Sequence, residues 1–463
     1  MTKTMVRTLG ILLVLLLMAV LPLSAGGQEE GAGPAEQMSQ EAVPGMEIDV
    51  AVMGKLTLRI AYPTGGEMPE NAIKGSFDQF SAQYPNVSFK PLSAPMVDFE
   101  NVVLKTILAK GDIPDLYYLT GGSWQLRKYV EAGNYAVDLT PYLYPHYGGL
   151  TQGDWGNDFI PSFLDVNRIR GSYYLIPFVA TSEWMWYNKK VFRQYGWNAA
   201  PDTWGDMLKK GDALKKDGIL PIALGDKERY PAGNWVCLLA QRVAGDQTFA
   251  GAFGRRKGYD FTNPDMVKTM KLIEDLVKKG YMNEGAAGMS ADTATMLLFQ
   301  NKAAMMPKGS WMVVIAKDMA PADFEYDVFP VPEVEGGKGY RDFIMGASNG
   351  FCVGKTANAE AAIAYQKFFT SKDMQLKMMQ EAGIFPVLKG VLSERNAAHP
   401  SQLKIEQYIL QAKGSSGWVD DGWGYDVADA FETAVETVLA GGSAAEAMKV
   451  AAQTVAKITR DPQ

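Results

Sequence analysis

The stretch KLTLRIAYPTGGEMPENAIKGSFDQFSAQYPNVSFKPL, Lys55–Leu92, joins two β-rich segments through one segment with helical spacing. Its first part, KLTLRIAY, alternates apolar and polar residues as a half-buried strand does. Ile73, Phe77 and Phe80 then recur every three or four residues, which is the spacing of one helix face. NVSFKPL has the composition of a second strand. This order predicts neighbouring parallel strands with helices on the faces of the sheet.

The alternation of strands and helices continues along the chain. PDLYYLT (114–120), YYLIPFVA (173–180), LPIALG (220–225) and NGFCVGK (349–355) are further apolar or β-rich segments separated by helical ones. No internal repeat and no Pro/Ser-rich linker divides them. The pattern predicts an α/β protein of two lobes, with a chain that crosses between the lobes several times.

One helix shows both of its ends in the sequence. In FTNPDMVKTMKLIEDLVKKG, Asn263 is a suitable N-cap and Pro264 fits the first helical position, where its missing N–H costs nothing. Gly280 is a typical stop signal. The spacing therefore predicts a helix from Pro264 to the residue before Gly280.

Composition excludes several classes of function. With 463 residues the chain is long enough for two or three domains, and its net charge of −7 comes without any Lys/Arg-dense run, so we expect no nucleic-acid partner. The only histidines are His146 and His399, and the only cysteines are Cys237 and Cys352. These residues have no metal-ligand spacing, so we expect no metal and no other cofactor. We expect the cysteines to be small buried thiols, although a disulfide is an alternative.

The first residues have the pattern of an export signal. Lys3 and Arg7 precede the apolar run LGILLVLLLMAVLPL, and the small residues 24–27 follow. This predicts a signal peptide over residues 1–27, with an uncleaved membrane anchor as the alternative. No cysteine follows that would accept a lipid, and residues 28–54 resemble a flexible spacer. We therefore expect an exported, soluble protein in the periplasm or outside the cell.

The segment AAMMPKGSW, Ala303–Trp311, contains the first candidate for a binding residue. Its apolar start predicts a buried strand with Met305 and Met306 in the core, which Pro307 would interrupt. The Gly-Ser bend that follows would present Trp311 as a flat face in a cleft. Packing of the ring into a core is the alternative.

Seven segments, in chain order, resemble the extracellular solute-binding proteins of ABC transporters, in the sugar-binding group that includes maltose-binding protein. They run in order through nearly the whole mature chain, between residues 109 and 391. The segments are AKGDIPDLYYL, AGNYAVDLTPYL, YLIPFVATSEWMWYNKKVF, PDTWGDMLKKGDAL, FQNKAAMMPKGSW, NGFCVGKTANAEAAIAYQKFFTS and GIFPVLKGV.

The resemblance implies a two-lobed periplasmic-binding-protein fold of type II, in which each lobe is a mainly parallel sheet flanked by helices. The N-terminal lobe would comprise residues 55–178 and 343–383. The C-terminal lobe would comprise residues 179–342 and 384–463. Several hinge crossovers would join the lobes and let them close on a ligand.

The resemblance also implies a function. The protein would be the extracytoplasmic, monomeric binding component of an ABC importer. It would capture a sugar or oligosaccharide between the lobes and deliver it to a permease in the inner membrane, without catalysis. A polyamine or other cationic solute is the first alternative ligand, because aromatic rings and carboxylates also suit cations. A secreted glycoside hydrolase is a further alternative, but it needs two carboxylates at a defined separation.

A sugar site needs flat aromatic faces for the C–H faces of the ring and polar groups for the hydroxyls. The ligand-binding candidates combine the two kinds of group. They are Trp311, Trp124, Trp423, Glu67, Glu183, Trp184, Tyr230, Trp235, Asn349 and Gly122.

Position in the predicted fold supports these candidates. Gly122 and Trp124 follow the third strand and Glu67 follows the first, where α/β sheets place their ligands. Glu183 and Trp184 lie at a crossover between the lobes, and strand alternation lets only one of them face the cleft. The family resemblance supports Trp311, Tyr230 and Trp235, and Asn349 lies beside the returning strand. Trp423, in a Gly/Asp/aromatic loop before the C-terminal helices, is preferred over Trp418 as a cleft ring. Trp204 is expected in the core.

Overall fold

The computed structural model describes residues 48–65, 68–131, 133–144, 154–382, 384–419 and 423–459. All of them belong to one unit of contacts, residues 43–463. The predicted signal peptide and the spacer up to residue 47 lie outside the described residues. Within the described ranges, no helix combines the length and the apolar character that spanning a bilayer requires.

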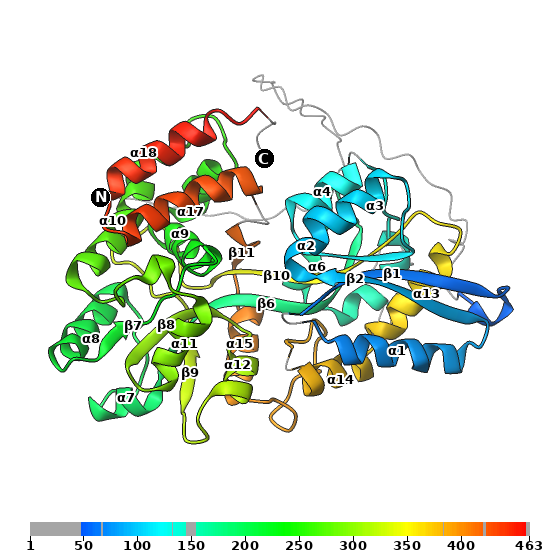
Figure 1. Ribbon diagram of the computed structural model, residues 1–463, viewed down its shortest axis with the longest axis horizontal. Coiled ribbons are helices and arrows are strands. Elements are labelled where there is room, and N and C mark those ends of the chain that lie inside the picture. Colours follow the sequence, from blue (N-terminus) through cyan, green and yellow to red (C-terminus); the bar gives the residue numbers. More distant parts are fainter. Residues whose placement is uncertain are drawn as a thin grey trace, which may run out of the picture. The chain divides into compact units, whose positions relative to one another are not determined.

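A single mixed sheet runs through the described residues (Figure 1). Its strand order is β2-β1-β3-β10-β6-β8-β7, with β11 beside β10 and β9 beside β6, while β4 and β5 form a separate hairpin. The strands are β1 (Leu56–Thr64), β2 (Val87–Pro95), β3 (Leu116–Leu119), β4 (Arg168–Ile169), β5 (Ser172–Tyr173), β6 (Leu175–Asn188), β7 (Leu220–Ile222), β8 (Ala303–Gly309), β9 (Tyr326–Phe329), β10 (Phe343–Val353) and β11 (Gly414–Ser416).

The predicted parallel pairing holds at both ends of the sheet. β1 pairs in parallel with β2 and β3, and β7 pairs in parallel with β8. The middle of the sheet is antiparallel: β10 runs against β3 and β6, and β6 runs against β8 and β9. The fold is thus α/β with a mixed sheet, in which two long central strands join two parallel parts.

The helices pack against these two parts of the sheet. α1 contacts β2, α13 contacts β10, α8 contacts β7 and α9 contacts β8, while α10, α17 and α18 pack on one another (Figure 1). The α-helices of eight or more residues are α1 (Glu70–Gln83), α4 (Trp124–Glu131), α8 (Trp204–Lys216), α9 (Tyr230–Phe253), α10 (Pro264–Lys279), α11 (Ala291–Phe299), α12 (Met312–Met319), α13 (Ala359–Phe369), α14 (Lys372–Ala382), α15 (Pro400–Leu410), α17 (Tyr425–Leu439) and α18 (Ala444–Val455).

The shorter helical segments serve mainly as connections. They are α2 (Met96–Asp98), α3 (Lys105–Ala109), α5 (Thr140–Leu143), α6 (Pro161–Asp165) and α7 (Lys189–Gln194). A π-helical turn, Phe99–Leu104, separates α2 from α3. The capping signals of α10 are confirmed, because the Asn263 side chain accepts a hydrogen bond from the Asp265 N–H at 2.9 Å and Gly280 adopts a left-handed φ of 63°.

Strand β6 is buried along all fourteen of its residues. Trp184 and Trp186 enter one hydrophobic cluster, which also holds β1, β3 and α13. Met185 and Tyr187 enter a second cluster, which holds α8, α9 and α17. Because successive side chains of a strand point to opposite faces, β6 forms part of both cores. The boundaries of the two lobes stay a prediction.

The interruption expected at Pro307 is wrong, because β8 continues through Pro307 to Gly309 and all seven of its residues are buried. β7 pairs with β8 only as far as Met305, so at Pro307 the strand keeps β6 as its paired neighbour. A strand tolerates proline at a position where the missing N–H has no neighbouring strand to pair with. Met305 and Met306 are core residues, as predicted.

Both cysteines are buried and unbridged. Cys352 lies on β10 between Tyr117 of β3 and Leu175 of β6, and Cys237 lies on α9. Both residues have an exposed fraction of 0%. The expectation of small buried thiols is therefore confirmed over the alternative of a disulfide.

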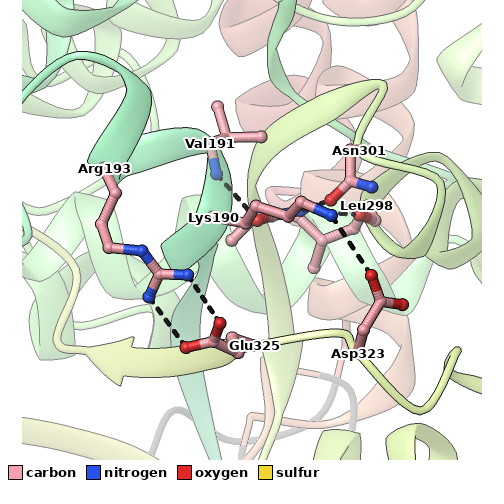
Figure 2. Close-up of polar contacts among 8 residues, drawn as sticks. Lys190, Val191, Arg193, Leu298, Asn301, Asp323 and Glu325 are labelled. Carbon is pink, nitrogen blue, oxygen red and sulfur yellow. Dashed lines mark hydrogen bonds and ion pairs between the residues drawn. The ribbon is translucent and has the colours of Figure 1, made fainter.

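Asn188 joins the end of β6 to its surroundings. Its side-chain oxygen accepts a hydrogen bond from the Val191 N–H at 3.0 Å, which caps α7. Its amide nitrogen donates to the Leu298 carbonyl at 3.2 Å and to the Asn301 side chain at 2.8 Å. Figure 2 shows these partners converging on one point. Asn188 has no exposed surface, and its contacts with Val191 and Leu298 are buried, whereas Asn301 is exposed.

Two exposed ion pairs flank this junction (Figure 2). Arg193 donates two hydrogen bonds to Glu325, at 2.6 and 2.8 Å, and Lys190 pairs with Asp323 at 3.2 Å. Exposed ion pairs contribute little to stability, about 0–1 kcal/mol each. The buried amide is therefore expected to matter more than either pair.

Replacing Asn188 by Ala should lower the free energy of unfolding by about 1–3 kcal/mol, because buried backbone groups lose their partners. Lys190→Ala is the matched control, since it removes an exposed contact of the same segment, and it should change stability by less than about 1 kcal/mol. Urea unfolding followed by tryptophan fluorescence measures both. Equal losses in the two variants would contradict the role of Asn188.

Asp226 precedes α9 and is 1% exposed. One of its carboxylate oxygens accepts a hydrogen bond from the Ala232 N–H at 2.8 Å, and the other has no hydrogen-bond partner among the described residues. Burial raises the pKa of Asp226 from 3.8 to about 7, against the lowering effect of the Ala232 hydrogen bond. The folded protein therefore holds this proton more tightly than the unfolded chain does.

Stability should fall as the pH rises from about 4 to about 7, because the unfolded chain ionises Asp226 first, and the total contribution is on the order of 4 kcal/mol. Asp226→Asn keeps an acceptor for the Ala232 N–H and should remove this part of the decline. Urea midpoints at several pH values between 4 and 8 test the effect. The exposed control Asp323→Asn should keep the wild-type slope; an unchanged slope in Asp226→Asn would contradict the assignment.

Candidate binding site

One cavity collects several of the predicted site residues. It has a volume of about 670 Å³, and we call it the Trp311 cavity. Its walls come from segments predicted to belong to both lobes. The lining residues are Met68, Met96, Tyr118, Thr120, Val179, Thr181, Tyr230, Asn234, Asp292, Lys308, Trp311, Val314, Ile315, Asp318, Met319, Asn349, Glu381, Ala382 and Trp418.

Three aromatic side chains form one wall of the Trp311 cavity. The ring of Trp311 meets Trp418 edge-on with centroids 5.7 Å apart, and Tyr230 at 6.4 Å with a tilt of 56°. Trp311 is half-buried, whereas Trp418 is 7% exposed. Their contacts fix the rings in place and leave part of the Trp311 surface available to a ligand.

The local backbone explains the position of Trp311. The ring folds back over Gly309, where a Cβ atom would come within 1.8 Å of the ring. Only glycine has room for this approach. Strand β8 ends at Gly309, Trp311 precedes α12, and the Ser310 N–H donates to the Ser182 carbonyl at 2.8 Å. The end of β8 is therefore anchored to β6, and the ring stands beside that anchor.

Polar groups face the same cavity from several elements. Thr120 follows β3 directly, as expected for a ligand site at the carboxyl end of a parallel strand. The side-chain oxygen of Asn349 accepts from the Gly121 N–H at 3.4 Å, and that of Asn234 accepts from the Val419 N–H at 3.1 Å. These bonds hold the oxygen atoms, and each NH₂ group is a further donor.

Charged groups also line the Trp311 cavity. Lys308 is 6% exposed, and its ammonium donates to the Thr295 hydroxyl at 3.0 Å. Asp292, Asp318 and Glu381 are exposed. The cavity therefore combines aromatic faces, amides and hydroxyls with one buried cation and three exposed carboxylates.

Three predicted residues meet in this cavity: Trp311, Tyr230 and Asn349. Trp423 and Gly122 are brought together elsewhere, in a second cavity described below. Trp124 begins α4, but its side chain is outside what the structure describes. Glu67 lies outside the described residues.

Trp235 is a core residue, contrary to the prediction that it lines the cleft. It has an exposed fraction of 0% and stacks on Trp204 with centroids 6.5 Å apart. Trp204 is itself buried, as expected. Helix α9 starts with Tyr230 at the cavity, but one and a half turns later its side chains point into the core.

Glu183 and Trp184 are both buried, at 3% and 2% exposure, so the expectation that one of them faces the cleft is corrected. Trp184 donates to the Ser182 hydroxyl at 2.6 Å and stacks on Tyr408. Burial raises the pKa of Glu183 well above its ordinary value, against the lowering effect of Lys308. Side chains that alternate along a strand include an exposed set only where one face of the sheet meets water. Both faces of the sheet are covered at β6.

Several lining residues were not identified from the sequence. Thr120 had a signal, because it is the last residue of the predicted strand 114–120, two residues before Gly122. Trp418 was considered but ranked below Trp423. Lys308 also had a signal: a lysine within an apolar strand is unusual unless it serves a partner or a site. Asn234 on α9 had none.

The second cavity has the same volume, about 670 Å³, and we call it the Trp423 cavity. It shares no lining residue with the Trp311 cavity. Trp423 is half-buried and packs on Phe249 and Phe253, with centroids 5.6 and 5.8 Å apart. The lining residues are Gly122, Arg127, Ser162, Asp165, Val166, Arg168, Asp246, Phe249, Ala250, Tyr340, Phe343, Lys413, Gly414, Ser415, Ser416, Gly417 and Trp423.

Comparison with known proteins gives consistent relatives. A multiple sugar-binding protein of Streptococcus mutans is 24% identical over 70% of this chain and 74% of its own length. A maltotriose-binding protein of Pyrococcus abyssi is 26% identical over 68% of this chain and 63% of its own length. Among solved structures, a chitin oligosaccharide binding protein superposes with a TM-score of 0.72 at 24% identity, over 87% of this chain and 99% of its own.

The fold is therefore that of two-lobed solute-binding proteins, as the sequence predicted. The family model of the bacterial extracellular solute-binding proteins matches residues 65–376, which is more than half of the chain. That range begins just after β1 and contains β2 to β10 and most residues of the Trp311 cavity. The protein belongs to the family of bacterial extracellular solute-binding proteins.

Proposed function

We propose that the protein is the sugar-binding component of an ABC importer and that the Trp311 cavity holds the sugar or oligosaccharide. The observation that carries this proposal is the aromatic wall of Trp311, Trp418 and Tyr230 together with amide and hydroxyl groups in one cavity. Aromatic faces cover the C–H faces of a pyranose ring, and polar groups satisfy its hydroxyls. The similarity to proteins named for multiple sugars, maltotriose and chitin oligosaccharides supports the same ligand class.

The mechanism follows from the way the cavity is built. Thr120, Tyr118 and Met68 come from segments predicted for the N-terminal lobe, and Tyr230, Trp311 and Trp418 from those predicted for the C-terminal lobe. A ligand that touches both groups favours the state in which they lie close together. Closure then presents a surface that the permease recognises. No chemical step is part of this mechanism, and the permease, the exported location set by residues 1–27 and the monomeric state belong to the proposal.

A cationic solute, such as a polyamine, is the second candidate ligand. Asp292, Asp318 and Glu381 line the same cavity and would attract a cation, and the rings would add cation–π contacts. Against it, Lys308 places a buried positive charge among the lining residues. Since the aromatic wall suits both ligand classes, the buried charge of Lys308 favours the sugar.

Trp311→Ala should weaken sugar binding by about 1–3 kcal/mol, because the ligand loses an aromatic face and its burial. Isothermal titration calorimetry with the best ligand of a carbohydrate screen measures the change. Trp197→Ala is the matched control: this half-buried ring stacks on Tyr195 and does not line the Trp311 cavity. Wild-type affinity in the Trp311 variant would remove that ring from the site.

A thermal-shift panel distinguishes the two ligand classes. A ligand at a hundredfold excess over its dissociation constant should stabilise the protein by about 2.7 kcal/mol. We expect stabilisation by an oligosaccharide and none by spermidine. Stabilisation by spermidine alone, lost when Asp292, Asp318 and Glu381 are changed together to the amides, would establish the cationic ligand instead.

A further inference from the structure

The Trp423 cavity is as large as the proposed sugar site but has a different chemistry. We propose that it is a second binding site, for a small solute that carries a carboxylate or phosphate group. The proposal does not depend on which ligand occupies the Trp311 cavity. It stands on three features of the lining: its cations, two hydroxyls without partners, and an aromatic wall.

Three exposed cationic side chains line this cavity: Arg127 on α4, Arg168 on β4, and Lys413 just before β11. Arg168 donates from Nε to the Gly171 carbonyl at 3.1 Å, which fixes its guanidinium near the cavity. Lys413 pairs with Asp342 at 2.8 Å. A guanidinium offers several N–H donors in a planar arrangement that matches the oxygens of carboxylate and phosphate.

Two carboxylates also line the cavity, and both accept hydrogen bonds from uncharged donors. Asp165 accepts from the Tyr173 hydroxyl at 2.6 Å. Asp246 accepts from the Gln241 amide at 2.9 Å and from the Tyr340 hydroxyl at 3.0 Å. Asp342 already balances Lys413. An anionic group would therefore be held by the N–H donors of Arg127 and Arg168 rather than by an excess of positive charge.

The hydroxyls of Ser162 and Ser416 point to the same conclusion. Both oxygens are buried, and neither has a hydrogen-bond partner among the described residues. Both residues line the Trp423 cavity, from α6 and from β11. A buried polar group without a partner costs about 1–3 kcal/mol, and a bound oxyanion would accept a hydrogen bond from each hydroxyl.

An aromatic wall provides room for the rest of the solute. Trp423, Phe249 and Phe343 lie against one another, with Phe249 meeting the other two edge-on at 5.6 and 5.8 Å. Trp423 is half-buried, so part of its ring remains accessible. The site therefore suits a ring or chain that carries one anionic group, such as an acidic sugar or a phosphorylated one.

The two cavities lie at different places along α9. Tyr230 and Asn234, in its first turns, line the Trp311 cavity, whereas Asp246 and Phe249, near its end, line the Trp423 cavity. The helical rise from Asn234 to Ala244 is roughly 15 Å, and Asp246 lies beyond a break in the helix at Gly245, where φ is 73°. A small solute in one cavity would not reach the other, so variants can separate the two sites.

The test uses calorimetry of the full exported protein with glucuronate, with inorganic phosphate and with glucose, all at one ionic strength. We expect an anion to bind the wild type and its affinity to fall about tenfold in Arg127→Gln, because a charge-assisted hydrogen bond is lost. Lys128→Gln removes the same charge from the neighbouring exposed position of α4, outside the cavity lining, and should leave the affinity unchanged. Ser416→Ala should weaken binding as well.

Trp311→Ala is the second control, and it should leave anion binding at the wild-type level. Glucuronate binding without phosphate binding would identify an organic acid held partly by Trp423, and phosphate binding would identify the oxyanion as sufficient. The proposal is overturned if neither anion binds, if glucose binds equally well at this site, if Arg127→Gln and Lys128→Gln weaken binding equally, or if Trp311→Ala abolishes it.

Discussion

The complete burial of β6 is the constraint on which the rest of the structure depends. A strand covered on both faces must place an apolar or satisfied side chain at every position, and β6 does so over fourteen residues. Alternate residues enter the two hydrophobic clusters, so one strand ties both together. Val179 and Thr181, near its middle, line the Trp311 cavity, and Asn349 comes from the neighbouring strand β10. The candidate site is thus lined by the two long central strands of the sheet.

Much of the fold could be predicted from local patterns. Apolar spacing identified β1, α1 and β2, and the caps of α10 were confirmed at Asn263 and Gly280. The length of β6 and the passage of β8 through Pro307 could not be predicted. Both depend on the neighbouring elements. The pairing of β7 with β8 ends at Met305, before Pro307, and helices cover both faces of β6. These neighbours are part of the tertiary structure. A fully buried strand has no alternation of polar and apolar residues that would reveal them.

The candidate site was predictable only in part, for a geometric reason. Trp311 follows a bend at the end of a strand, and that position in the chain alone suggests a cavity. Trp235 follows Tyr230 by five residues, which turns it about 140° around α9, from the cavity wall into the core. Trp423 and Trp418 are five residues apart on one segment, yet they line different cavities. Residue type suggested which rings to consider, and packing decides which of them line a cavity.

The two unbridged thiols have a consequence for the kinetics of the molecule. Cys352 lies in the sheet between β3 and β6, and no reagent can reach its sulfur while these strands stay paired. Alkylation of that atom requires the strands to separate, so the alkylation rate of the native chain reports how often they separate. Because no disulfide joins the two cysteines, the rate of strand separation should be the same in oxidising and reducing solution.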